Sequence, residues 1–216
     1  MARNTIKRVF GSIRSVINLT IKEQGLGCAN AFSGTFMPYG LPVTKRQPIP
    51  VSDIHKIQQK CFEQDDELRW IIALLSDTGM RLGEAIDLLQ TDINLSAEIP
   101  HITLKPHPWR RLKTPRSERQ IPLVGSSLWA AKRTLKQHTD SEYAFPNYCS
   151  DEGHKTYSAS AALNKWLKAQ APEGCVVHSF RHSMRDRLRA IECPFNVISQ
   201  IGGWSTAGVG SDYGNG

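Results

Sequence analysis

Five short stretches of the sequence carry side chains that could act on a phosphodiester. They are residues 77–84 with Arg81, 111–114 with Lys113, 178–181 with His178 and Arg181, 202–204 with Trp204, and Tyr213. Breaking a phosphodiester needs a nucleophile, positive charge at the non-bridging oxygens and a proton for the leaving oxygen. The planar guanidinium groups of Arg81 and Arg181 can each donate paired hydrogen bonds to phosphate oxygens. Two such groups could supply the electrostatic stabilisation that metal ions give in many nucleases.

The spacing of apolar residues predicts the elements that hold these stretches. Helical spacing covers residues 4–24, and the following glycines suit the end of that helix. Further helices are expected at residues 53–62 with Ser52 as the cap, 68–75, 81–89, 126–138, 158–171, 179–192 and 194–202. Residues 100–105 and 119–124 are expected to be short strands on either side of a basic loop. The predicted fold class is mainly α with a small antiparallel β-sheet (α+β).

Glycine and proline residues indicate the domain organisation. They are concentrated in residues 28–50, which are expected to be a linker. Residues 1–27 are then expected to be the terminal helix of an upstream domain. Residues 51–216 are expected to form the main domain, which is long enough to bury a sizeable core.

The charge distribution indicates an anionic partner without proving one. The chain has 27 Lys and Arg residues against 20 Asp and Glu residues, a formal net charge of +7. Residues 104–138 alone hold nine basic side chains and one acidic one. Such a segment attracts a polyanion through its charge and through counterion release. A solvated basic face would have the same composition, so charge alone leaves both interpretations open.

Composition excludes several classes of protein. The hydrophobic content of 40% is that of an ordinary globular chain and excludes a disordered or fibrous one. The sequence contains neither an apolar run long enough for a membrane span nor a signal-peptide pattern. The five cysteines are odd in number and form no C-x-x-C pair, which favours reduced thiols in a cytosolic protein and argues against a structural zinc site.

Taken in order, the five stretches resemble the motifs of the tyrosine recombinase (phage-type integrase) family. The sequence reads T-G-x-R-x-x-E, a hairpin lysine, H-x-x-R, G-W at a position where many members have G-H, and a tyrosine nine residues further on. The resemblance extends over residues 41–216, and residues 4–24 are similar to the last helix of the family's core-binding domain. It implies the catalytic-domain fold of that family, with no cofactor and no metal.

The resemblance also implies a role for each stretch. Tyr213 is the expected nucleophile, which forms a 3′-phosphotyrosyl link to DNA. His178 is expected to accept the tyrosine proton or to position the phosphate, and Lys113 to protonate the departing 5′ oxygen. Trp204 is expected to donate its indole N–H to a phosphate oxygen and to support Tyr213. Glu84 is expected to be structural and to hold a basic neighbour.

The implied function is site-specific DNA recombination that integrates or excises a phage or genomic island. Five basic residues around the hairpin are expected to contact the DNA backbone: Lys105, Arg110, Arg111, Arg116 and Arg119. The implied partner is double-stranded DNA, on which a homotetramer assembles from chains that are monomers when free. Accessory DNA-bending proteins, no membrane contact and a cytoplasmic, nucleoid-associated location complete the expectation.

Alternatives remain open at this point. A type IB topoisomerase-like enzyme would share the chemistry and relax DNA without strand exchange. A non-catalytic DNA-binding module would use only the basic hairpin and helices. A metal-dependent nuclease would need clustered carboxylates, which the acidic residues of 53–98 do not provide. His178 and His182 have a spacing that can bind zinc, but a helix-surface pair is the simpler interpretation.

Overall fold

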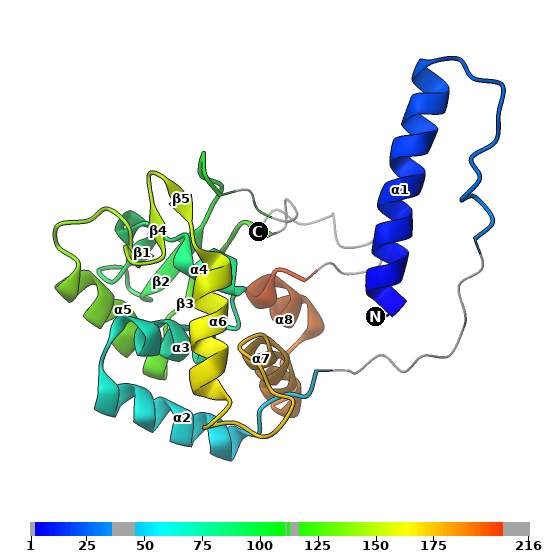
Figure 1. The fold of residues 1–216 in the computed structure, drawn as a ribbon. Coiled ribbons are helices and arrows are strands. Elements are labelled where there is room, and N and C mark those ends of the chain that lie inside the picture. The colour runs from blue at the N-terminus through cyan, green and yellow to red at the C-terminus, as the bar shows by residue number, and fades with distance from the viewer. Residues whose placement is uncertain (1–2, 36–45, 111, 113–116, 205–216) are drawn as a thin grey trace. The chain divides into compact units, whose positions relative to one another are not determined.

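The computed structural model describes residues 3–35, 46–110, 112 and 117–204. The chain divides into two compact units, Met1–Lys45 and Arg46–Gly216, and each is described by itself (Figure 1). No helix in the described residues combines the length and the apolar character needed to cross a lipid bilayer.

The first unit is a single long helix, α1 (Arg3–Glu23), with the chain folded back along it. The side-chain amide of Asn30 donates to the carbonyl oxygen of Arg14 at 3.0 Å and to Oδ1 of Asn18 at 2.7 Å. The rings of Phe10 and Phe32 add a contact, with 6.0 Å between their centroids. That this helix is the end of an upstream domain stays a prediction.

The second unit is mainly helical with small antiparallel sheets, as the sequence predicts. Its helices are α2 (Val51–Gln64), α3 (Glu67–Thr78), α4 (Leu82–Ile86), α5 (Gly125–Gln137), α6 (Thr156–Leu167), α7 (Ser179–Ala190) and α8 (Phe195–Gly202), with a 3₁₀ turn at Gln90–Asp92. Its strands are β1 (Ile93–Asn94), β2 (His101–Leu104), β3 (Arg119–Pro122), β4 (Cys149–Ser150) and β5 (Gly153–His154).

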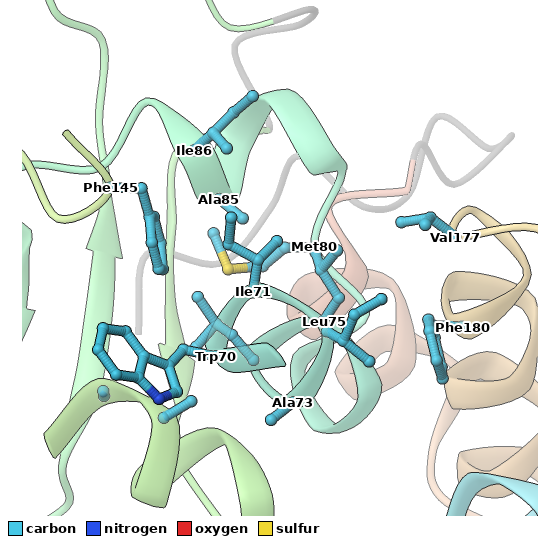
Figure 2. Close-up of a cluster of buried hydrophobic side chains, with 14 of the residues drawn as sticks. Trp70, Ile71, Ala73, Leu75, Met80, Ala85, Ile86, Phe145, Val177 and Phe180 are labelled. Atoms are coloured by element: carbon cyan, nitrogen blue, oxygen red, sulfur yellow. The ribbon is translucent and has the colours of Figure 1, made fainter. Parts of the chain in front are cut away.

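Helix α3 is the centre of the core. Its residues from Trp70 to Thr78 are all buried. The run I-I-A-L-L is apolar on every side, and the polar residues that follow it are buried with hydrogen-bond partners. Helices α5, α2 and α7 pack around it. Figure 2 shows Leu75 of α3 facing Phe180 of α7, and Ile71 of α3 beside Met80 and Ala85. This packing fixes α7 and α4 relative to each other through a shared neighbour.

The ends of α3 follow from two residues. The Asp66 carboxylate accepts a hydrogen bond from the Arg69 backbone N–H at 3.1 Å and caps the N-terminus. Gly79 ends the helix in the left-handed conformation, with φ +61. The expected cap of α2 is wrong: that helix begins at Val51 after Pro50, so Ser52 lies inside its first turn.

The main sheet has the strand order β1-β2-β3, and every pairing is antiparallel. The expected strands correspond to β2 and β3, in which Ile102 pairs with Ile121. The sequence did not predict β1 or the β4–β5 hairpin, because two-residue strands show no alternation. The helix expected over residues 81–89 ends at Ile86 instead. The chain leaves the helix there because Leu88 and Gln90 bond to the backbone of the 142–144 segment.

We expect Gly79→Ala to destabilise the protein by about 1–3 kcal/mol. An added Cβ would lie 2.9 Å from Cβ of Met184, and the backbone at Gly79 has φ +61, which alanine disfavours. Urea unfolding of both proteins would measure the change in the free energy of unfolding.

Gly83→Ala is the matched control. No atom lies within 4 Å of the position of its Cβ, and Gly83 lies within α4. Alanine there should leave the stability unchanged or raise it by up to about 1 kcal/mol. Equal effects of the two substitutions would contradict a specific requirement for glycine at residue 79.

Candidate active site

Arg181 is the most deeply held of the expected site residues. It lies in the first turn of α7 and is 4% exposed. Its Nη1 donates to the carbonyl oxygen of Gly79 at 2.7 Å, and its Nη2 donates to that of Gly202. Burial, followed by the charge of Arg81, lowers its pKa to about 10, so it remains protonated at neutral pH. A guanidinium has five N–H donors, so these two bonds leave others for a phosphate.

Arg81 lies immediately before α4 and is fixed by Glu84. The Arg81 backbone N–H donates to Oε2 of Glu84 at 2.9 Å, and its guanidinium forms an ion pair with Oε1 of the same carboxylate. The side chain is 27% exposed, so part of it faces solvent. Glu84 also accepts from Nη2 of Arg119 at 3.1 Å. The expectation that Glu84 holds a basic neighbour is therefore confirmed, and there are two such neighbours.

His178 stands at the start of α7, where the residue is partly exposed to solvent and partly desolvated. Partial desolvation lowers the pKa of His178 to about 4, and Arg46 is the largest of the nearby positive charges that add to this effect. The imidazole is therefore neutral at physiological pH, so one of its ring nitrogens is unprotonated. The His182 ring lies edge-on to it, with 5.3 Å between the centroids. No group of three or more metal-ligating side chains occurs in the described residues.

Trp204 covers the guanidinium of Arg181. The Cζ atom of Arg181 lies 4.4 Å from the centroid of the indole ring, and that of Arg185 lies 5.6 Å away. These are cation–π distances. A Cβ on Gly202 would fall 1.9 Å from the Trp204 ring, so the ring can lie here only over a glycine. The G-G-W stretch therefore places an aromatic ring on the site arginine.

The fold brings together four of the six expected catalytic residues. Arg81 and Arg181 are close enough for their charges to lower the pKa of His178, and Trp204 contacts Arg181 directly. They come from the start of α4, the start of α7 and the residues after α8. The remaining two, Lys113 and Tyr213, lie outside the described residues.

Two of the five expected DNA contacts are at odds with the structure. Arg110 is 3% exposed and binds the Asp92 carboxylate at 3.3 Å and the carbonyl oxygens of Asp87 and Lys105. It therefore stabilises the base of the hairpin, and its guanidinium is not exposed to an outside ligand.

Arg119, like Arg110, is buried. It is 8% exposed, and its Nε donates to the carbonyl oxygen of Ile201 at 2.8 Å while Nη2 binds Glu84.

Lys105 is half-exposed and lies 3.8 Å from Asp92, so it keeps a solvent-facing position. Arg111 and Arg116 lie outside the described residues.

Sequence reasoning missed two basic residues beside the site, Arg46 and Arg185. Arg185 follows Arg181 by one helical turn, so the spacing contained a signal that could have found it. Arg46 lies in the stretch expected to be a linker, and no sequence pattern connects it to His178.

We expect the His178 ring to titrate at about pH 4 in the folded chain, because desolvation and nearby positive charge disfavour its protonated form. Between about pH 6.5, the ordinary value for histidine, and pH 4, the unfolded chain then binds more protons than the folded one. The stabilising contribution of this group is thus present above pH 6.5 and is lost as the pH falls through that window. NMR titration of the ring C–H signals, assigned with His178→Gln, would measure it.

The urea-unfolded chain serves as the reference in the same titration. Its His178 signal should move near pH 6.5. A titration midpoint of His178 at or above pH 6.5 in the folded chain would contradict the effect of desolvation and nearby cationic side chains on this ring.

Comparison with solved structures shows the same fold in two integrases bound to DNA and in a recombinase. The Tn1549 transposon integrase in complex with a circular intermediate DNA matches with a TM-score of 0.66 at 17% identity, covering 95% of this chain and 73% of that one. A lambda integrase dimer bound to a COC′ core site matches with a TM-score of 0.67 at 16% identity, covering 98% and 59%. The XerA recombinase matches with a TM-score of 0.58 at 17% identity, covering 89% and 65%.

Sequence comparison decides the family. No curated protein gives a match. The family model described as the phage integrase family matches residues 49–214, which include all six expected catalytic residues and most of the chain. The chain therefore belongs to the phage integrase family, and its second unit is a tyrosine recombinase catalytic domain.

Proposed function

We propose that this chain, as a tyrosine recombinase, breaks and rejoins DNA strands at specific sites through a covalent 3′-phosphotyrosyl link. The observation that carries the proposal is the meeting of Arg81, His178 and Arg181. Two guanidinium groups, from the starts of α4 and α7, lie near one neutral imidazole, and the Trp204 ring covers the guanidinium of Arg181. This arrangement suits a phosphodiester, which needs fixed positive charge and a proton acceptor.

The reaction follows from the chemistry of these groups. The Tyr213 hydroxyl attacks phosphorus and the bond to the 5′ oxygen breaks, while Arg81 and Arg181 bind the non-bridging oxygens. Tyrosine has an ordinary pKa of about 10, so it must lose its proton during the attack, and His178 is the neutral acceptor. Lys113 supplies a proton to the departing 5′ oxygen. Attack by a second 5′ hydroxyl reverses these steps and joins a new strand without an external energy source.

Trp204 takes a supporting role in this proposal. It packs on the guanidinium of Arg181, which restricts that side chain to the orientation held by Gly79 and Gly202. An indole cannot transfer a proton as histidine would. The proton transfers are therefore assigned to His178 and Lys113.

The proposal extends to the assembly, the location and the biological role of the protein. A lambda integrase has been solved as a tetramer bound to a Holliday junction. By analogy, we infer a homotetramer on two DNA partners, assembled from monomers in the cytoplasm at the nucleoid. Integration or excision of a phage or genomic island, with accessory DNA-bending proteins, fits this activity.

We expect a covalent protein–DNA adduct to form on nicked suicide duplexes and to survive denaturation. Because the target site is unknown, the duplexes would be supplied as a pool of sequences, with a chelator present. Tyr213→Phe should abolish the adduct, since phenylalanine has no nucleophilic oxygen. Tyr157→Phe is the matched control, because that tyrosine is 94% exposed on α6 and should leave the adduct unchanged.

Each other outcome has a distinct meaning. An adduct that persists in Tyr213→Phe would identify a different nucleophile. An adduct that forms only in a parallel reaction without the chelator would point to a metal-dependent enzyme. DNA binding without any adduct would favour a binding module, and relaxation of supercoiled plasmid without strand exchange would favour a topoisomerase-like enzyme.

A further inference from the structure

We propose that Arg46 and Arg185 bind backbone phosphates of the DNA next to the scissile one, as the direct phosphate contacts on this face of the domain. The inference deepens the proposed function, because it takes DNA as the partner of the same site. Arg46 and Arg185 take the role in DNA-backbone contact that the sequence indicated for Arg110 and Arg119, which are buried.

The charge around the site exceeds what one phosphodiester can balance. Five guanidinium groups take part in the electrostatics of His178 and Arg181, namely those of Arg46, Arg81, Arg119, Arg181 and Arg185. Two of them, Arg81 and Arg119, share the Glu84 carboxylate. A scissile phosphodiester carries a single negative charge, fewer than these cationic groups. A surplus of this size fits a run of several phosphates along a DNA strand.

The arginines differ in how many of their N–H donors already bind groups of the protein. Arg119 is bonded to Glu84 and to two carbonyl oxygens, and Arg81 is paired with Glu84. Further along α7, Arg187 is paired with Asp77 at 3.1 Å. The side chains of Arg46 and Arg185, in contrast, make no hydrogen bond or ion pair with any residue that the structure describes. Their charges are therefore free to meet an outside anion.

The backbone holds Arg46 beside His178. The N–H of Ile49 donates to Oγ of Ser183 on α7 at 2.7 Å, and the Sγ of Cys175 lies 3.8 Å from the carbonyl oxygen of Gln47. These contacts fasten the segment after Arg46 to residues on both sides of His178. Arg46 itself is exposed, and its charge is felt at the His178 ring.

Trp204 holds Arg185 beside the other side of the site. The Cζ atom of Arg185 lies 5.6 Å from the indole centroid, next to the Arg181 group at 4.4 Å. A ring contact restricts the direction of the side chain without consuming its N–H donors. Arg185 is half-buried, so its hydrocarbon stem packs while its charge stays available.

The test measures binding to a duplex of arbitrary sequence over a range of salt concentrations, by fluorescence anisotropy. Each phosphate contact contributes about 0.9 to the slope of log K against log salt. Arg46→Gln and Arg185→Gln should therefore each reduce the slope by about 1, and the double variant by about 2. At about 0.15 M salt, each should weaken binding by about fivefold. Arg46→Lys and Arg185→Lys keep the charge and should retain the slope.

Lys60→Gln is the matched control. Lys60 is exposed on α2 and paired with Glu63 at 2.9 Å, so the substitution changes the net charge by the same amount. It should leave the slope within error of the wild type. A slope change no larger than in this control, or weaker binding with an unchanged slope, would overturn the inference. So would a wild-type slope near zero.

A second readout separates the two arginines. Arg46→Gln should raise the pKa of His178 from about 4 toward its ordinary value, because Arg46 is the largest charge acting on that ring. Arg185→Gln should leave it unchanged, and the opposite pattern would contradict the placement of Arg46. Neither measurement needs strand cleavage, so both can be made in Tyr213→Phe. A failed capture experiment would then leave this inference standing, and a failed salt test would leave the proposed nucleophile standing.

Discussion

The buried carboxylate of Glu84 is the interaction on which the rest of the site depends. Guanidinium groups gathered in a protein interior repel one another, and each needs compensating negative charge. Burial by itself would raise the pKa of Glu84, but the charges of Arg119 and Arg81 hold it below its usual value. The carboxylate is therefore ionised at neutral pH. It ties the start of α4 to β3, and through Arg119 to the end of α8.

Arg181 is stabilised differently, by the ends of two helices. Its donors bind the carbonyl oxygens of Gly79 and Gly202, at the C-terminal ends of α3 and α8. Carbonyls at these ends lack partners within the helix and carry partial negative charge. This arrangement requires close approach, and both glycines leave room for it, Gly79 against Met184 and Gly202 against Trp204. The packing of the core thus positions the ends of α3, α7 and α8, and these ends position the side chains of the site.

The sequence predicted the parts of this arrangement that depend on local pattern. Apolar spacing indicated the helices and the central strands, and motif order indicated Arg81, His178, Arg181 and Trp204, which the fold brings together. It could not predict which arginines of the basic hairpin are buried. Arg110 is buried because Asp92 lies opposite it, and Asp92 comes from a 3₁₀ turn that no pattern reveals. Contacts of this kind exist only after the chain has folded.

Arginines that look alike in the sequence therefore differ in the folded protein, according to how deeply each is buried. An arginine whose donors are satisfied by carbonyl oxygens and carboxylates has little left for a ligand, because each new bond would replace an existing one. An arginine held by its stem or by a ring contact keeps its donors and its charge. In this domain the first group, with Arg110 and Arg119, fixes the framework. The second group, with Arg46 and Arg185, lies beside the candidate active site with its charge uncompensated by the described residues, where a polyanion would supply the balance.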